Sequence, residues 1–294
     1  MNKMDYQLID SGFGEKLERF GRYTIIRPCS QAIWSKSEDL SEIWSSSDAS
    51  FSRRKGLNWK VRNAIPESWI VQLHTIKMKL KITNFGHVGF FPETLNLWEN
   101  IREKIIEAKA PHKKPFQFLN LFAYSGGATM AASQVGAHCC HVDASKGMVQ
   151  WAKENAQINL LADKPIRWIV DDVNKFLKRE IRRGTRYDGI LLDPPSFGRG
   201  KSGELYKIEN AIIETLENVR KVLSDEFSFI YLTSHTPGFT PTVLSNLLNK
   251  LFDNGSITSG EMLLKAKEEK ILNIPNGSWS CINNISSCGK IMIK

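Results

Sequence analysis

The sequence lacks any apolar run of the roughly 18 residues that a helix needs to cross a bilayer. Its first ten residues, MNKMDYQLID, also lack the apolar stretch of a signal peptide. We therefore expect no membrane span and no export. The expected location is the cytoplasm.

Cysteine is scarce, with five residues in 294, and none of their spacings matches a zinc-ligand pattern. Cys139 and Cys140 are adjacent in an apolar strand pattern, and the next cysteine is Cys281. Disulfides are rare in the cytosol, so these residues are interpreted as reduced, structural thiols. No metal site is expected.

Acidic residues are outnumbered, with 31 Asp and Glu against 40 Lys and Arg, which gives a formal net charge of +9. An excess of positive charge favours polyanionic partners. Between Phe51 and Lys81 there are eight basic residues against one acid, Glu67, with Trp59 and Trp69 interleaved. This mixture suits phosphate contacts with base stacking, and it equally suits a solvated sheet face over core tryptophans. A second basic cluster, at 178–186, is more typical of a solvated helix face.

The pattern of apolar residues changes along the chain. Up to Pro92 it shows short apolar runs and turns, with alternation over 77–82, which predicts a small β-rich domain over residues 1–92. A helix from Thr94 leads into the second domain, 93–294. There, apolar segments alternate with helical stretches, at 116–122, 138–144, 166–170, 187–193 and 227–233. Strands without alternation are buried on both faces, so this domain is predicted to be a doubly wound α/β fold with a parallel sheet.

The last part of the second domain gives weaker signals. A helix is predicted from Pro241 to about Phe252. Two strand candidates, 261–266 and 271–274, follow it and would complete the sheet. The C-terminal NNISSCGKIMIK gives no clear pattern.

Ligands of open α/β sheets bind beyond the carboxyl ends of the strands. The first strand is followed by a glycine turn, 123–129, where the backbone can approach a ligand at a helix N-terminus. Asp143 ends the second strand 17 residues after Gly126, near the spacing at which a carboxylate accepts ribose hydroxyls. The GxGxxG fingerprint of dinucleotide sites is absent. A ligand with a ribose and no pyrophosphate fits, and S-adenosylmethionine is such a ligand.

The next two strand ends also carry candidate groups. Asp171-Asp172 can accept a bond from an adenine amino group, or Asp172 can simply cap the following helix. The fourth strand delivers Asp193-Pro194-Pro195-Ser196-Phe197, in which two prolines remove backbone donors and leave carbonyls available. A planar base can donate an amino group to these carbonyls or to Asp193 while it stacks on Phe197. A rigid strand stop is the simpler alternative for this loop alone.

Four motifs together closely resemble those of class I S-adenosylmethionine-dependent methyltransferases that modify bacterial large-subunit ribosomal RNA. They are NLFAYSGGATMAA (120–132), HVDAS (141–145), DDV (171–173) and LLDPPSFGRG (191–200), within a resemblance over about residues 85–235. The resemblance implies a seven-stranded Rossmann-like sheet with S-adenosylmethionine as the cofactor. The implied cofactor-binding residues are Phe122, Tyr124, Ser125, Gly126, Thr129, Asp143, Ala144, Asp172 and Asp193. The implied catalytic loop, which holds the acceptor base, contains Asp193, Pro194, Pro195 and Phe197.

The chain departs from the family pattern in two places. Members that make 5-methylcytosine carry a nucleophilic Cys at the fifth strand, because C5 reacts only after a thiolate adds to the ring. This chain has YLTSHTPG (231–238) there, so transfer to a nitrogen is favoured over transfer to cytosine C5, unless a distant cysteine folds in. His235 either orients the acceptor, shuttles a proton or serves structure alone. The first 90 residues are also too short for the PUA and linking β domains of several relatives.

The leading hypothesis is an enzyme that methylates a base of RNA, with large-subunit ribosomal RNA as the expected substrate. One alternative is a methyltransferase that acts on a small molecule or a protein. Another is a non-catalytic RNA-binding assembly factor that keeps the methyltransferase fold, and a nicotinamide dehydrogenase is disfavoured by the glycine loop. The sequence leaves open whether the protein is a monomer or a homodimer, whether residues 1–92 bind RNA, and what Arg199 and Lys201 do.

Overall fold

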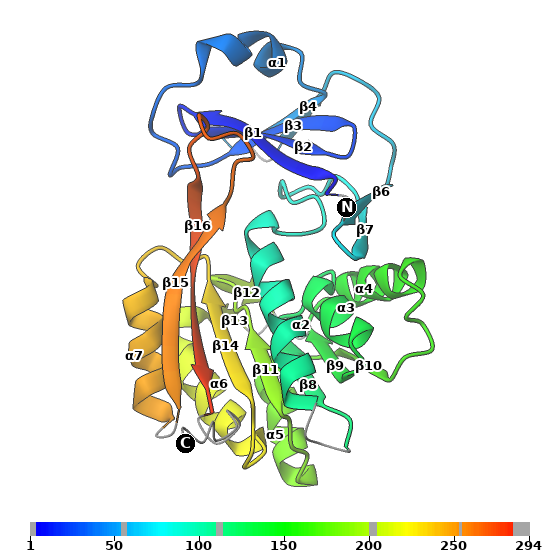
Figure 1. The fold of residues 1–294 in the computed structure, drawn as a ribbon, viewed down its shortest axis with the longest axis vertical. Helices are drawn as coiled ribbons and strands as arrows, with labels where there is room; N and C mark the ends of the chain where they lie inside the picture. Colours follow the sequence, from blue (N-terminus) through cyan, green and yellow to red (C-terminus); the bar gives the residue numbers. More distant parts are fainter. Residues whose placement is uncertain (1–3, 54–57, 110–113, 200–204, 253–254, 285–294) are drawn as a thin grey trace, which may run out of the picture. The chain divides into compact units, whose positions relative to one another are not determined.

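The computed structural model describes residues 4–53, 58–109, 114–199, 205–252 and 255–284. The chain divides into two compact units (Figure 1). Unit 1 comprises Met1–Leu95 and Met262–Asn276, and unit 2 comprises Asn96–Glu261 and Gly277–Lys294. The predicted division was 1–92 and 93–294, so the segment Met262–Asn276 lies in a different unit from the one that the sequence suggested.

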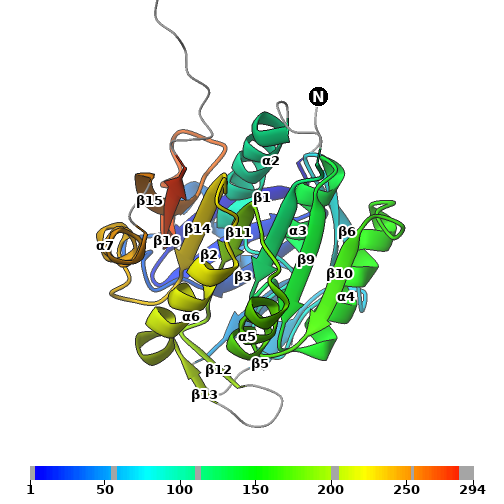
Figure 2. The ribbon, with the colours of Figure 1, turned by 90° about the horizontal axis from the view of Figure 1, so that it is seen from below.

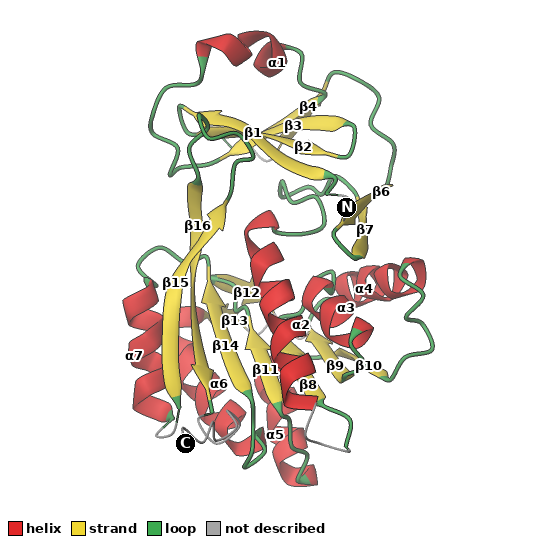
Figure 3. Ribbon diagram, in the orientation of Figure 1, coloured by secondary structure: helices red, strands yellow, loops and turns green. Residues whose placement is uncertain are grey.

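Strands are the main regular elements of unit 1 (Figure 3), as the sequence predicted. A five-stranded sheet has the order β1-β2-β3-β4-β5, in which only the pair β3 and β4 is parallel among the pairs described. A hairpin, a short helix and two 3-10 turns complete the unit. The bounds are β1 Tyr6–Gly12, β2 Glu15–Phe20, β3 Tyr23–Pro28, η1 Glu38–Leu40, α1 Ser41–Ser45, β4 Ala49–Ser52, β5 Asn58–Val61, β6 Trp69–Leu73, β7 Ile76–Leu80 and η2 Pro92–Thr94.

The segment Met262–Asn276 belongs to unit 1 because its apolar side chains complete a small core there. Leu264 and Ile274 are buried in a cluster with Leu8, and Leu8 also forms a parallel bridge to Ala266. The side chain of Asn276 donates a hydrogen bond to the buried Glu93. Burying one Leu or Ile stabilises a fold by about 1.5–3 kcal/mol, so this segment stabilises unit 1.

The two tryptophans of the basic stretch are used for packing. Trp59 lies 5.1 Å from the Phe51 ring, and its Nε1 donates to the Thr83 carbonyl at 2.7 Å. Trp69 packs against the Tyr23 ring at 5.3 Å and donates to the Phe20 carbonyl at 3.2 Å. These contacts favour the solvated-face interpretation of the stretch over base stacking by its indoles.

The sheet of unit 2 has seven strands in the order β10-β9-β8-β11-β14-β16-β15, and Figure 2 follows it from β15 at one edge to β10 at the other. Strands β10, β9, β8, β11 and β14 are parallel, and β16 is antiparallel to β14. This confirms the predicted α/β fold. The strands are β8 Gln117–Leu121, β9 His138–Asp143, β10 Ile166–Val170, β11 Gly189–Leu192, β14 Phe229–Ser234, β15 Ser256–Leu264 and β16 Ile274–Asn283.

Helices alternate with these strands. The helices are α2 Leu95–Lys109, α3 Gly127–Gln134, α4 Lys146–Ile158, α5 Val173–Arg183, α6 Ile208–Val222 and α7 Pro241–Leu251. A small hairpin, β12 Phe197–Arg199 and β13 Leu205–Lys207, precedes α6. Within the described ranges, no helix combines the length and the apolar character needed to cross a bilayer.

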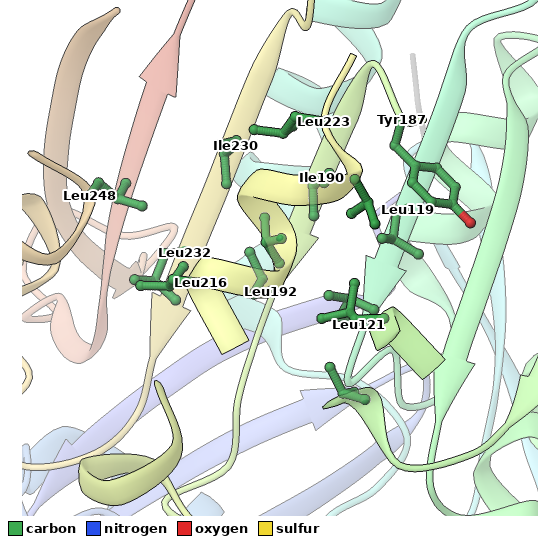
Figure 4. Packing of buried hydrophobic residues seen from close by; sticks show 14 of the residues in the cluster. Leu119, Leu121, Tyr187, Ile190, Leu192, Leu216, Leu223, Ile230, Leu232 and Leu248 are labelled. Carbon is green, nitrogen blue, oxygen red and sulfur yellow. The ribbon is translucent and has the colours of Figure 1, made fainter. Parts of the chain in front are cut away.

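The central strands are apolar on both faces because helices cover each face. On one face, Leu119, Ile190 and Ile230 pack with side chains of α5, α6 and α7, among them Leu216 and Leu248 (Figure 4). On the other face, Asn120 of β8 bonds to α3, and Lys104 of α2 bonds to Asn283 of β16. Continuous apolar runs such as GILL therefore predict the buried strands correctly.

The two late strand candidates were wrong in their bounds. The sequence predicted strands at 261–266 and 271–274, whereas β15 spans Ser256–Leu264 and β16 spans Ile274–Asn283. β16 begins with Ile-Pro-Asn-Gly, residues that normally indicate a turn, and β15 is mostly exposed in its first half. Most of NNISSCGKIMIK lies outside the described residues.

Candidate functional site

The carboxyl ends of the five parallel strands lie together at one end of the sheet, and β8 is the middle strand of the five. Leu121 of β8 pairs with Val142 of β9 on one side and with Leu192 of β11 on the other. The chain order of the strands reverses at this point, and open α/β sheets bind ligands beyond the carboxyl ends of the strands at such a point. The loops that leave β8, β9, β10, β11 and β14 here contain most of the candidate site residues. Asp143 is the last residue of β9, Thr129 lies in α3, and Phe197 begins β12.

The loop after β8 has an unusual backbone. Phe122 and Tyr124 have φ angles of 56° and 50°, and Gly126 has 89°. Left-handed backbone is unfavourable for bulky L-residues, and such strain is typical of functional sites. Hydrogen bonds hold the loop in this shape: Ala123 N donates to Val142 O at 3.0 Å, and Asn155 Nδ2 donates to Ser125 O at 2.8 Å.

The two adjacent glycines of this loop serve different needs. Gly126 has a left-handed φ, and a Cβ there would lie 3.0 Å from the Cβ of Ala152. Gly127 begins α3, and a Cβ there would lie 2.0 Å from Cζ2 of Trp98 in α2. The left-handed turn therefore requires glycine at position 126, and the close packing of α3 against Trp98 requires glycine at position 127.

Asp143 at the end of β9 joins two loops. Its Oδ2 accepts from Tyr124 N at 2.9 Å and its Oδ1 accepts from Ser145 N at 2.8 Å. Burial raises the pKa of this carboxyl, although both backbone bonds act in the opposite direction. Each carboxylate oxygen has a second lone pair, so Asp143 can still accept two hydroxyl groups of a ligand. Ala144, next to it, is half-buried.

A buried polar network lies beneath the glycine loop. The Thr129 hydroxyl accepts from Asn120 at 2.9 Å and lies 3.0 Å from Nδ1 of His141. Burial lowers the pKa of His141 to about 3, which keeps the imidazole neutral. Thr129 is 0% and Ser125 2% exposed, so their side chains support the loop from below and do not line its open side.

The two acids after β10 are already engaged. Asp172 caps α5, accepting a hydrogen bond from Lys175 N at 2.9 Å. Asp171 accepts from Asp172 N at 2.9 Å and pairs with Arg179. Capping and the ion pair account for both side chains, while Asp172 remains partly exposed at the strand end.

Tyr206 of β13 joins this end of the site, and sequence reasoning missed it. Its ring lies 5.2 Å from that of Phe122. Burial, and to a smaller extent the charge of Asp172, raises the pKa of Tyr206 to about 12. The residue lies in a short hairpin that the sequence does not indicate, and the aromatic character of Tyr206 is the only signal it carries.

The loop after β11 contacts the end of β14 and the residues that follow it through three pairs of side chains. Asp193 Oδ1 accepts from the Thr233 hydroxyl at 2.6 Å, and Nδ1 of His235 lies 3.6 Å from the same oxygen. The hydroxyls of Ser196 and Thr236 are 2.7 Å apart. Pro194 is buried, Pro195 is exposed, and Phe197 keeps 51% of its surface exposed.

The second basic cluster is largely engaged in ion pairs within unit 2. The carboxylate of Glu180, 0% exposed, accepts from both Arg167 and Arg183 and from the Tyr187 hydroxyl. Arg179 pairs with Asp171, and Lys178 with Glu214 at 2.7 Å. The cluster therefore organises α5, as the solvated-face interpretation expected. Lys201, whose role the sequence leaves open, lies outside the described residues.

The described cysteines, Cys29, Cys139, Cys140 and Cys281, are all buried and unpaired in disulfides. Burial raises the pKa of Cys140 to about 11 and that of Cys281 to about 12. A buried thiol with a raised pKa is a poor nucleophile. In the described part of the chain, no group of His, Cys, Asp and Glu residues has the arrangement of a metal site.

Comparisons with known proteins place this geometry in context. Residues 96–249 match the family described as Conserved hypothetical protein 95. The chain is similar to a crystal structure of a SAM-dependent methyltransferase from Agrobacterium tumefaciens, with 34% identity, a TM-score of 0.88, and coverage of 96% of this chain and 91% of that one.

Curated relatives are matched over part of their length. The chain is 29% identical over 167 residues to Ribosomal RNA large subunit methyltransferase I of Aliivibrio fischeri, covering 54% of this chain and 40% of that protein. It is 26% identical over 203 residues to Ribosomal RNA large subunit methyltransferase K of Neisseria meningitidis, covering 68% and 54% respectively. The chain thus spans about half the length of these relatives.

Proposed function

We propose that the chain transfers a methyl group to a nitrogen of an RNA base. The chain belongs to the S-adenosylmethionine-dependent methyltransferases, and the family model that it matches is described as Conserved hypothetical protein 95. The observation that carries this proposal is the convergence of the strained loop after β8, Asp143 and the Asp193 loop at the switch point of the sheet. The proposed substrate is large-subunit ribosomal RNA, the substrate in the names of the curated relatives.

S-adenosylmethionine fits the residues at this edge. When bound, it supplies a methyl carbon activated by a sulfonium. Phe122, Tyr124 and Gly126 give the loop after β8 its left-handed turn, and the second lone pairs of the Asp143 oxygens suit ribose hydroxyls. Tyr124, Ala144 and Asp172 are proposed to line the site, with Tyr206 and Phe122 forming an aromatic wall. Ser125 and Thr129 are proposed to support the loop from below.

The acceptor base is proposed to bind at the loop after β11. Asp193 keeps Oδ2 available for an amino group, since its Oδ1 accepts from Thr233. Phe197, half of whose surface is exposed, is available for stacking, and Pro194-Pro195 hold the loop rigid. Transfer to a nitrogen is proposed because cytosine C5 requires a thiolate, and the described cysteines are buried with raised pKa values.

The positive charge of the chain supports a polyanionic substrate, and part of this charge lies on unit 1. On the β6–β7 hairpin, Lys77 and Lys79 alternate with the buried Ile76, Met78 and Leu80, so they share the outer face. We propose that this face contacts phosphates, and that the enzyme acts in the cytoplasm, where ribosomal RNA is found. Such binding weakens steeply with salt.

The test is methyl transfer from radiolabelled S-adenosylmethionine to ribosomal RNA from cells that lack the gene. We expect labelled large-subunit RNA, retained cofactor binding in Asp193→Ala, and a large loss of transfer in that variant. Asp163→Asn, an exposed acid before β10, is the matched control and should behave as wild type. Labelling of a protein or small molecule in place of RNA would overturn the substrate, and cofactor binding without any transfer would overturn the enzymatic role.

A further inference from the structure

One side chain at the carboxyl ends of the strands has no part in the function proposed so far: His235 after β14, which faces the carboxylate of Asp193 after β11. Nδ1 of His235 lies 3.6 Å from Asp193 Oδ1, and the two side chains are 29% and 25% exposed. At this distance a protonated imidazole and the carboxylate form an ion pair. Both side chains are thus partly accessible from solvent.

The position of His235 is set on both sides. Two residues before it, Thr233 donates to Asp193 Oδ1 at 2.6 Å; one residue after it, Thr236 bonds to Ser196 at 2.7 Å. The segment from Thr233 to Thr236 is therefore hydrogen-bonded at both ends to the loop after β11, and His235 lies between these two hydrogen bonds. Groups held in this way need little reorganisation to react.

The other titratable groups at this edge are less suited to receive a proton. Asp143 is bonded to two loop N–H groups, Asp172 caps a helix, and Asp171 is paired with Arg179. Tyr206 has a pKa of about 12 and stays protonated at neutral pH. Histidine is the side chain that ordinarily titrates near neutrality.

We propose that His235 accepts the proton that the acceptor nitrogen loses, and hence that the methylated atom is a nitrogen that carries hydrogen. Such atoms are the exocyclic amines and the ring N–H groups of bases, in contrast to a bare ring nitrogen such as guanine N7. The acceptor lone pair forms the N–C bond, the S–C bond of the sulfonium breaks with its electrons on sulfur, and the N–H proton passes to the imidazole. This inference rests on the proposed function.

Asp193 then has a second role, because its negative charge compensates the imidazolium that forms. It is the charged group that faces the ring from β11, and the neighbouring side chains of Thr233, Ser234 and Thr236 on the segment of His235 itself are neutral. The rate of transfer should therefore rise with pH as the imidazole loses its proton, because only the neutral imidazole can accept another.

The experiment measures single-turnover methyl transfer to ribosomal RNA between pH 5 and 8.5, with nucleoside mass spectrometry of the product. In His235→Asn we expect unchanged cofactor binding, a loss of about 10²–10⁴-fold in rate, and loss of the wild-type rise with pH. Added imidazole should partly restore transfer in His235→Ala. His138→Gln, at the amino end of β9, is the matched control and should keep the wild-type profile.

The outcomes separate this inference from the function on which it rests. Wild-type transfer with a 7-methylguanosine product overturns the inference and leaves the proposed function in place. A 5-methylcytidine product overturns both the inference and the proposed transfer to a nitrogen. A slower His235→Asn variant that keeps the wild-type pH profile and does not respond to imidazole shows a structural role, and also overturns it. No transfer to RNA by the wild-type protein overturns the proposed function, and the inference with it.

Discussion

Replacing Gly127 by Ala tests the claim that this glycine exists for helix packing. The added Cβ would lie 2.0 Å from Cζ2, 2.4 Å from Cη2 and 2.5 Å from Cε2 of Trp98. Ordinary contacts begin near 3.4 Å, so the indole must move by more than 1 Å, and Trp98 is only 6% exposed. Overpacking of this kind costs about 1–3 kcal/mol, or about 2–4 °C in Tm for each kcal/mol in a unit of this size.

The assay is a double-mutant cycle in urea, followed by circular dichroism. Trp98→Leu removes the obstructing ring atoms and is itself destabilising, by less than the roughly 3–5 kcal/mol of truncation to Ala. In its background, Gly127→Ala should cost little, which gives a coupling of about 1–3 kcal/mol. Gly126→Ala is the matched control, because its cost of roughly 1–2 kcal/mol comes from the left-handed φ and persists when Trp98 is Leu. Additive effects of Gly127→Ala and Trp98→Leu would refute the packing argument.

Three further predictions concern the carboxylates and the buried histidine. Asp143→Asn should weaken S-adenosylmethionine binding about 10–100-fold in calorimetry, and unchanged affinity would remove Asp143 from the site. The free energy of unfolding should fall as pH drops from about 6.5 towards 3, because unfolded His141 binds a proton that the folded residue, with a pKa of about 3, does not. In His141→Asn the free energy of unfolding should depend less steeply on pH in this range, and the same dependence as in the wild type would contradict the argument. Glu180→Gln should destabilise unit 2 by about 3–5 kcal/mol in urea and leave cofactor affinity unchanged, since Glu180 is buried among two arginines and Tyr187; a loss below about 1 kcal/mol would contradict this.

The central strands and the candidate loops could be predicted because each is encoded locally. Runs such as GILL have no polar face, and only a parallel sheet between helix layers buries both sides. Asp143 and Asp193 could be singled out because a strand end is visible in the sequence. What each side chain contacts could not be predicted, since Asp193 meets Thr233 and His235 across about 40 residues of chain.

The strain after β8 could not be predicted either. Nothing in Phe122 or Tyr124 favours a positive φ, which is imposed by bonds to β9 and α4. Asp172 shows the opposite case: its two interpretations, ligand contact and helix cap, were both evident in the sequence. The structure establishes the cap and leaves the contact with adenine as a proposal.

The path of the chain between its two units limits how the protein can be divided. The chain passes from one unit to the other near residues 95, 261 and 276. A fragment that ends at residue 95 would lack the strand segments carrying Leu264 and Ile274, and would expose the apolar surface that they cover. Unit 1 therefore cannot be exchanged between relatives as a simple N-terminal module. A natural or engineered replacement has to bring its own β15–β16 loop, so the two segments must evolve together.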